Sequence, residues 1–309
     1  MREVMAAAVV LHSLRGWGQR GARSLPFSRG LGAGWGSPGL ILGKSIYLRR
    51  GFSFSALAYL GYEVYRGICQ AAVVYASEKV ISDQILDRAD YLYEAGETEK
   101  LYHFLQEYKQ SDNAEILWRL ARASRDVAML NSTAEYDKKR LIYEALDFAQ
   151  RALSIDEEHF AVHKWYAICI SDVGDYEGTS TKIADSYLIK GHLQKAIELN
   201  PYDATSYHLM GLWCWSFASL SWFQRKMGAM LFATPPTSTF EEALQYFLKA
   251  EKVAPNFYSQ NLLSLGKTYL QLKDKINARF WLTKAKDYPA HTEDDKEVQK
   301  EAAQLLKNL

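Results

Sequence analysis

The sequence predicts an all-α protein in which antiparallel helix pairs stack side by side. Two stretches near the C-terminus place small and bulky residues at similar spacings: Ala243, Phe247, Ala250 and Pro255 in the first, and Gly266, Ala278, Leu282, Ala285 and Pro289 in the second. Small residues let two helix backbones approach closely, bulky residues fill the gap between pairs, and proline ends a helix because it lacks an N–H donor. Such a unit, repeated at about 34 residues, is typical of a tetratricopeptide-like superhelix.

Earlier parts of the chain contain further copies of the same helix pair. The first pair is predicted to run from Ala89 to Tyr93, through a turn at Gly96, and then from Leu101 to Tyr108. The second and third units are marked by Leu120, Ala121, Ala145, Ala149 and Ala152, and by Tyr166, Ala167, Ile189, Leu193, Ala196 and Pro201. The sequence therefore predicts five units, three of them with inserted loops.

The largest insertion separates the two helices of the fourth unit. Gly211 and Ala243 are 32 residues apart, whereas Gly266 and Ala278 are 12 apart. The extra residues are rich in Trp and Phe, as in the run LWCWSF from residue 212 and the run SWFQRK from residue 221. One interpretation is a longer first helix and an additional helix that cap the array. The other is a lid over a ligand cavity, since clustered aromatic side chains supply a large apolar surface.

Residues 1–51 form a basic, Gly-rich leader that we expect to be disordered. Residues 1–53 hold eight Lys or Arg and one acid, a net charge of +7, whereas the rest of the chain carries −6. An Arg-rich, Ser-containing segment almost free of acids is typical of a transit-type leader and favours mitochondrial targeting. Ten glycines among the same residues oppose a long amphipathic helix. Mitochondrial and cytoplasmic locations are both consistent with this segment.

Residues 52–79 are predicted to form an amphipathic helical segment, and residues 80–309 the repeat domain. The stretch 52–76 is apolar, but Glu63 and Arg66 near its centre would be costly inside a bilayer. We therefore predict no transmembrane segment. The helix is expected either to dock on the first helical pair or to lie at a membrane interface through aromatic side chains such as Tyr62 and Tyr65.

The sequence lacks the motifs of common enzyme and cofactor sites. Its two GxGxxG runs, from residues 16 and 34, lie in the Gly-rich leader, and it has no phosphate loop and no nucleophile elbow. Asp172, Asp175 and Glu177 are predicted to be solvated acids in a Gly-punctuated turn between two helices. We therefore predict a protein that is not an enzyme, with no catalytic residue and no cofactor, and without a nucleic-acid partner.

The cysteines and histidines point to packing rather than to chemistry. Cys69, Cys169 and Cys214 are odd in number and far apart, with apolar neighbours on both sides of Cys169 and Cys214 and on one side of Cys69, which indicates buried reduced thiols. His159 and His163 lie four residues apart, but no carboxylate or cysteine partner has a ligand-like spacing. An ordinary inter-helix pair is expected there, and no metal site.

The first helix of each unit lines the groove of a tetratricopeptide array, and its groove positions follow from the small-residue markers. These positions are mostly basic or aromatic, although the repeat region is acidic overall. The predicted partner-binding residues are Trp118, Arg122, Arg125, Lys164, His208, Trp215 and Lys267. Their cations are expected to converge on one anionic ligand, such as an acidic peptide tail or a phospholipid headgroup. In the alternative interpretation, the two arginines pair with acids such as Asp126 or Asp172.

Five runs of the sequence resemble the regulator of microtubule dynamics family: ADYLYEAGETEKL from residue 89, WRLARASRD from 118, HKWYAIC from 163, LFATPP from 231 and KDYPAHT from 286. The resemblance covers about residues 52–309. It implies a tetratricopeptide-like protein associated with microtubules and spindle poles. One member of that family lies at mitochondrial contacts with other membranes and binds phospholipid through its repeats.

We therefore expect a binding scaffold of the cytoplasm and the cytoskeleton, at the spindle and spindle pole, whose partner is the microtubule. The tubulin surface is acidic, so a chain whose repeat region is itself acidic must make this contact through a local basic surface. The alternative is a mitochondria-associated protein that binds anionic phospholipid or acts at membrane contacts. Both partners are anionic, and the same basic and aromatic residues suit either.

Overall fold

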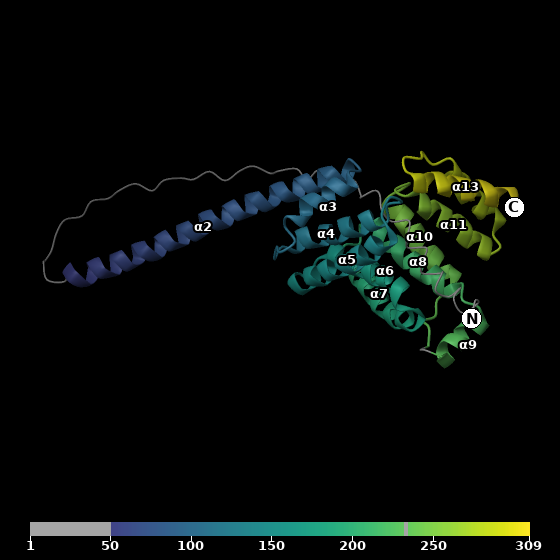
Figure 1. Ribbon diagram of the computed structural model, residues 1–309, viewed down its shortest axis with the longest axis horizontal. Coiled ribbons are helices and arrows are strands. Elements are labelled where there is room, and N and C mark those ends of the chain that lie inside the picture. Colours follow the sequence, from purple (N-terminus) through teal and green to yellow (C-terminus); the bar gives the residue numbers. More distant parts are fainter. Residues whose placement is uncertain (1–50, 232–233) are drawn as a thin grey trace. The chain divides into compact units, whose positions relative to one another are not determined.

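A computed structural model of the protein describes residues 51–231 and 234–309, with side chains for all of these except 51–61 and 69–79. The predicted disordered leader thus lies outside the described residues, apart from Gly51. Every regular element in the described ranges is a helix (Figure 1), which confirms the all-α prediction. In chain order the helices are α2 (Gly51–Glu94), α3 (Thr98–Gln106), α4 (Ala114–Ala128), α5 (Glu135–Ile155), α6 (Phe160–Glu177), α7 (Thr179–Leu199), α8 (Ala204–Ala218), α9 (Trp222–Leu231), α10 (Phe240–Val253), α11 (Ser259–Gln271), α12 (Lys275–Lys286) and α13 (Glu293–Lys307).

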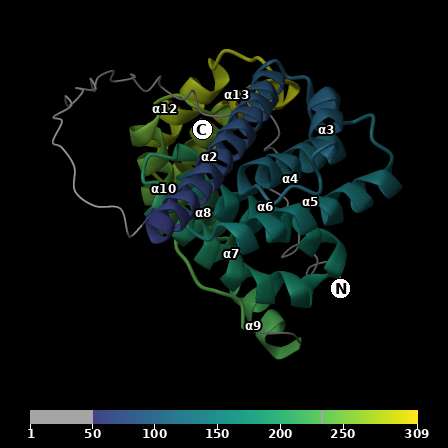
Figure 2. The same cartoon turned by 90° about the vertical axis from the view of Figure 1, so that its left-hand side faces the viewer.

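The helices from α4 onward form the predicted antiparallel pairs. Helix α4 packs on α5, α6 on α7, α8 on α10 and α11 on α12, and α13 closes the array against α11 and α12. The first helices of consecutive pairs also contact one another, as α4 contacts α6, α8 contacts α11 and α11 contacts α13. We refer to α4, α6, α8, α11 and α13 as the inner row. The repeat domain is a tetratricopeptide-like superhelix, seen from two sides in Figures 1 and 2.

The pairs pack closely because small residues lie where helices cross. The marker alanines of α5, α7, α10 and α12 are fully buried: Ala145, Ala149, Ala152, Ala196, Ala243, Ala250, Ala278 and Ala285. A Cβ atom built on Gly211 would lie 2.5 Å from the Phe247 ring, and one built on Gly266 would lie 2.6 Å from Leu282. Real Cβ atoms do not approach so closely. Each glycine therefore permits one helix crossing.

Helix boundaries follow from local polar residues and from proline. Asn113, Asp203 and Asp274 accept backbone N–H hydrogen bonds at the N-termini of α4, α8 and α12. Thr239 and Thr292 complete capping boxes at the N-termini of α10 and α13. The predicted stops are also confirmed, since α7, α10 and α12 end shortly before Pro201, Pro255 and Pro289.

The insertion in the fourth unit contains the predicted additional helix, α9, which lies between α8 and α10 in the chain. Figures 1 and 2 both place α9 at the periphery of the repeat domain, beyond the end of α7 and α8. The preceding helix α8 buries Trp213, whose Nε1 donates to the Ser186 carbonyl oxygen at 2.9 Å. The aromatic run of the insertion is thus divided between a buried part in α8 and an outlying helix.

Helix α2 continues without a break from Gly51 to Glu94, through Gly61, Gly67 and the predicted domain boundary at residue 80. The chain divides into two compact units between Arg88 and Ala89, so the last turns of α2 belong to the repeat domain. Within residues 51–231 and 234–309, no helix is long and apolar enough to cross a membrane.

We predict that Gly266→Ala destabilises the repeat domain by about 1–3 kcal/mol. The new methyl group would lie 2.6 Å from the Leu282 side chain and 3.2 Å from the Leu282 backbone nitrogen. The matched control is Gly191→Ala in α7, an exposed helical glycine with no other atom within 4 Å of its Cβ position. That change should be neutral or should stabilise the helix by up to about 1 kcal/mol. Urea unfolding of the two variants measures the difference, and equal midpoints would contradict the assigned crossing.

Candidate functional site

Trp118, Arg122 and Arg125 lie on one face of α4, since residues three and four apart share a helix face. The Arg122 guanidinium lies 3.5 Å from the ring centroid of Tyr93 and 3.7 Å from the Asp90 carboxylate, both at the end of α2. Burial lowers the pKa of Arg122, because desolvation opposes the charged form. Its Nε and Nη2 have no hydrogen-bond partner among the described residues. Arg122 is therefore a buried cation with unused hydrogen-bond donors.

Arg125 is fully buried and joins α4 to α6. Its Nε donates a 2.5 Å hydrogen bond to Oδ2 of Asp172, whose side chain is 4% exposed. The alternative prediction that Arg125 pairs with a neighbouring acid is confirmed. Asp126 lies in the same buried cluster, and burial raises its pKa to about 7 although the charges of Arg125 and Arg122 lower it.

The Trp118 side chain lies in a second polar group at the N-terminal end of α4. Its Nε1 donates to Oε2 of Glu115 at 2.8 Å, and its ring stacks on His159, with centroids 6.4 Å apart. His159 and Arg119 each contact the Glu115 carboxylate, at 2.8 and 2.5 Å. Burial alone would raise the pKa of Glu115, but these two partners lower it to about 2. The predicted inter-helix role of His159 is thus observed between α4 and the start of α6.

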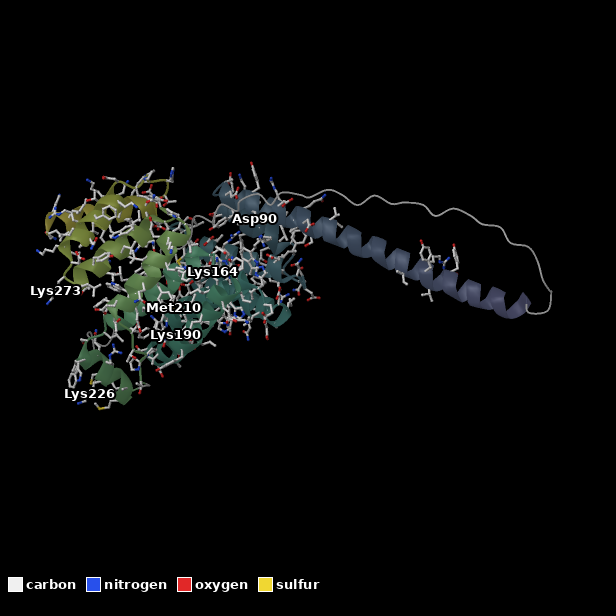
Figure 3. The ribbon with its side chains drawn as sticks, turned by 180° about the vertical axis from the view of Figure 1, so that it is seen from behind. Asp90, Lys164, Lys190, Met210, Lys226 and Lys273 are labelled. Carbon is white, nitrogen blue, oxygen red and sulfur yellow. The ribbon has the colours of Figure 1, made fainter. Side chains whose placement is uncertain are left out.

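Lys164 joins α6 to α8. Its Nζ lies 3.1 Å from both carboxylate oxygens of Asp203, and both side chains are buried. Asp203 also accepts hydrogen bonds from the backbone nitrogen and the hydroxyl of Ser206, so one carboxylate caps α8 and pairs with the preceding unit. Figure 3 labels Lys164 in the interior of the repeat domain.

His208 joins α8 to α11. It is fully buried, and its Nδ1 lies 2.9 Å from Oδ1 of Asn261. Because Asn261 Nδ2 donates to the Phe247 carbonyl oxygen, its Oδ1 accepts from His208, which places the imidazole proton on Nδ1. Burial lowers the pKa of His208 to about 4. The ring is therefore neutral at pH 7.

Trp215 and Lys267 lie together where α8 meets α11. The Lys267 Nζ lies 5.8 Å from the Trp215 ring centroid and 2.8 Å from Oε1 of Glu301 in α13. The Trp215 Nε1 has no hydrogen-bond partner among the described residues. A second link to α13 is the 2.7 Å hydrogen bond from the Ser259 hydroxyl to Asp295.

All seven predicted residues lie on the inner row, but the structure gives three of the four cations separate acidic partners. Arg125 pairs with Asp172, Lys164 with Asp203 and Lys267 with Glu301. Lys164 and Asp172 are eight residues apart on α6, which is about 12 Å along the helix. We refer to these pairs, together with the contacts His208–Asn261 and Ser259–Asp295 and the contact Asp90–Arg119 that joins the end of α2 to α4, as the inner-row ladder.

One sequence expectation is wrong and several ladder residues were missed. Asp172, Asp175 and Glu177 lie within α6 and not in a solvated turn. Asp172 is buried against Arg125, and Asp175 pairs with Lys182 at 2.5 Å. The acceptors Asp203, Asn261 and Glu301 were not predicted. These acceptors could have been found by looking for acidic or amide residues near the groove positions of the following unit.

Other histidine and cysteine side chains of the described ranges lie outside the inner-row ladder. No group of three His, Cys, Asp or Glu side chains there could hold a metal ion. His163 and His192 face each other across α6 and α7, with their Nδ1 atoms 2.7 Å apart. Cys169 and Cys214 are buried free thiols, and burial raises the pKa of both, whereas the side chain of Cys69 lies outside the described set.

Comparisons with known proteins identify the relatives of this chain. The family model described as regulator of microtubule dynamics protein 1-3 matches residues 85–309. Regulator of microtubule dynamics protein 1 of Mus musculus is 62% identical over 283 residues, which are 91% of this chain and 92% of that protein. The protein of the same name from Pongo abelii is 64% identical over 266 residues, covering 86% of this chain and 84% of that protein.

A solved structure shares the fold. A thermophilic TPR protein of Thermus thermophilus matches 72% of this chain and 98% of its own chain, with a TM-score of 0.51 and 15% sequence identity. At this identity the likeness concerns the fold alone. It agrees with the helix pairs described above.

We predict that Asp172→Asn destabilises the repeat domain by about 3 kcal/mol or more, because it removes the charge that faces the buried Arg125 guanidinium. Arg140→Ala is the control. Arg140 forms exposed pairs with Asp137 and Glu144 along α5, and its loss should cost less than about 1 kcal/mol. Chemical unfolding of both variants measures the costs. A small effect of Asp172→Asn would contradict the structural role of this pair.

We further predict that His208 makes folding sensitive to acid. Its folded pKa of about 4 is below the ordinary value of 6.5, so the unfolded chain takes up a proton as the pH falls between these values while the folded chain does not. His208→Gln keeps an amide donor for Asn261 but does not titrate. Between pH 6.5 and pH 4, the wild type should lose up to about 3 kcal/mol more stability than this variant. Parallel pH profiles of the unfolding free energy would refute this assignment.

Proposed function

The chain belongs to the regulator of microtubule dynamics family, and we propose on this basis that it is a non-enzymatic binding scaffold that associates with microtubules and the mitotic spindle. The scaffold is a tetratricopeptide-like array, an architecture that presents an extended surface to a partner. The proposed locations are the cytoplasm and the cytoskeleton, at the spindle and the spindle pole. The proposed partner segment is anionic and binds along the inner row.

The observation that carries this proposal is the state of Arg122. Its guanidinium is buried, stacked on an aromatic ring and 3.7 Å from the nearest carboxylate oxygen of Asp90, while two of its nitrogens lack hydrogen-bond partners among the described residues. Unsatisfied buried donors are costly, and a carboxylate would satisfy Nε and Nη2 together in a fork geometry once the side chain, which is buried in the free protein, turns toward the partner. An acidic peptide such as a tubulin tail supplies such a carboxylate.

The other predicted residues divide into two roles. Trp118, Trp215 and Lys267 are proposed to contact the partner with Arg122. The Trp215 Nε1 is an unused donor, and Lys267 lies beside that ring. Arg125, Lys164 and His208 are buried and engaged with the next unit, so they are proposed to hold the inner-row helices in place for binding.

A second candidate function is binding of anionic phospholipid by a mitochondria-associated form of the protein. The net charge of +7 in residues 1–53 favours mitochondrial targeting. A lipid phosphate would satisfy the Arg122 donors as a carboxylate does, and tryptophan side chains would pack against acyl chains. The two candidates therefore share a site and differ in the partner.

We predict that Arg122→Gln lowers the affinity of the full chain for microtubules, measured by co-sedimentation, at least about tenfold. It should also lower the salt dependence of binding, because one charge-assisted contact is lost. Arg279→Gln is the control, since Arg279 is an exposed cation on α12 and its replacement removes the same charge. Thermal unfolding of each variant checks that it remains folded. Anionic vesicles in place of microtubules test the second candidate.

The outcome separates the two functions. A loss confined to microtubules supports tubulin as the partner, and a loss confined to vesicles supports the phospholipid. If Arg122→Gln and Arg279→Gln bind both partners equally well, Arg122 is not part of the site. The basic leader would then be the remaining source of attraction for an anion.

A further inference from the structure

Helix α9 has an inverted distribution of polarity. Four of its exposed side chains are large and apolar: Trp222 (71%), Phe223 (51%), Met230 (66%) and Leu231 (55%). The residues that face the domain are Gln224, Arg225 and Met227, which are half-buried, and Gly228, which is buried. A surface helix of a soluble domain normally turns its apolar face inward. The apolar face of α9 is therefore directed at something other than its own domain.

The orientation of α9 is fixed by contacts on its inner side. The Arg225 guanidinium donates 2.7 Å hydrogen bonds to the carbonyl oxygens of Phe217 and Pro236, one on each side of the helix in the chain. Gly228 lies against Pro235 and Ile183, close enough that a Cβ atom would approach Pro235 to 3.0 Å. These contacts prevent the helix from rotating its apolar face inward.

The charge on α9 is of one sign. The helix contains Arg225 and Lys226 and no acidic residue. The two hydrogen bonds of Arg225 described above go to backbone carbonyl oxygens and not to a carboxylate. On the exposed face, the Lys226 Nζ lies 4.8 Å from the Trp222 ring centroid. Lys226 occupies an outlying position in Figure 3, far from Lys164 in the interior. Exposed aromatic and aliphatic side chains next to unopposed positive charge match the interface of an anionic bilayer.

The size of the apolar face favours a bilayer over a protein partner. Ten helical residues span about 15 Å, and four partly exposed side chains offer on the order of 400 Å². A stable protein interface buries about 800 Å² on each partner. Binding to a bilayer does not require an interface of this area, because a helix at the membrane surface needs only to insert its side chains by about 5–10 Å.

We propose that α9 is a membrane-contact helix, which inserts Trp222, Phe223, Met230 and Leu231 into the headgroup region of an anionic bilayer while Lys226 contacts lipid phosphates. The site is separate from the inner row and does not depend on the function proposed for that surface. Helix α9 does not span the membrane. It brings one end of the repeat domain to the lipid surface.

The experiment is flotation of the full chain with phosphatidylcholine vesicles that do or do not contain phosphatidylserine. Trp222→Ser combined with Phe223→Ser should lower partitioning onto phosphatidylserine vesicles at least about tenfold. This loss should persist at raised salt, because insertion of apolar side chains is not screened. Lys226→Glu should lower partitioning at least about fivefold at low salt only. The two signatures distinguish insertion from attraction by the basic leader, which is common to all variants.

The control is Tyr136→Ser combined with Tyr202→Ser, which removes two aromatic side chains that are 82% and 84% exposed elsewhere on the domain and should leave partitioning unchanged. Wild-type partitioning by the α9 double variant at every salt concentration would overturn the proposal. So would loss of binding on Ile276→Ser with Phe280→Ser, which would assign the contact to α12. A defect of the α9 variant in microtubule binding alone would assign α9 to a protein partner instead.

Discussion

The repeat domain depends on buried polar contacts between the first helices of consecutive units, above all on the ion pair of Arg125 in α4 with Asp172 in α6. In a stacked array each unit contacts only its neighbours, so every interface must select its own register. Apolar contacts are non-directional, whereas Lys164 with Asp203 and His208 with Asn261 are satisfied in one arrangement. We infer that the inner-row ladder fixes how each unit sits on the next, while alanine and glycine crossings bring the helices together.

This use of charge limits what the inner row can offer a partner. Arg125 and Lys164 are balanced within the domain, so they add little attraction for an external anion. Arg122 differs, because the Tyr93 ring and the Asp90 carboxylate, 3.7 Å away, leave its Nε and Nη2 without a hydrogen-bond partner among the described residues. The proposed partner surface is therefore smaller than the seven residues suggested by the sequence. It lies at the start of the array, with Trp215 and Lys267 as a second contact further along.

The sequence was most informative where a feature is local. Ala278, Leu282 and Ala285 predicted a helix crossing because they repeat the spacing of an earlier buried set in α10, and the additional helix α9 followed from the length of the insertion. Asp172 was misassigned to a turn because its partner Arg125 lies 47 residues away and no local pattern links them. The outward apolar face of α9 could not be predicted either, since Trp222 and Phe223 suit a buried lid equally well until the contacts of Arg225 orient the helix.

We thus propose two binding surfaces on the domain. The inner row binds an anionic segment, and α9 contacts a bilayer. Hydrogen–deuterium exchange of the full chain, measured with and without microtubules, tests the claim about the inner row most directly. We predict slower exchange in the α4 and α8 peptides that contain Arg122 and Trp215, and no change in the outer helices α5 and α12. Protection confined to α5 or α12, with α4 and α8 unaltered, would contradict the account.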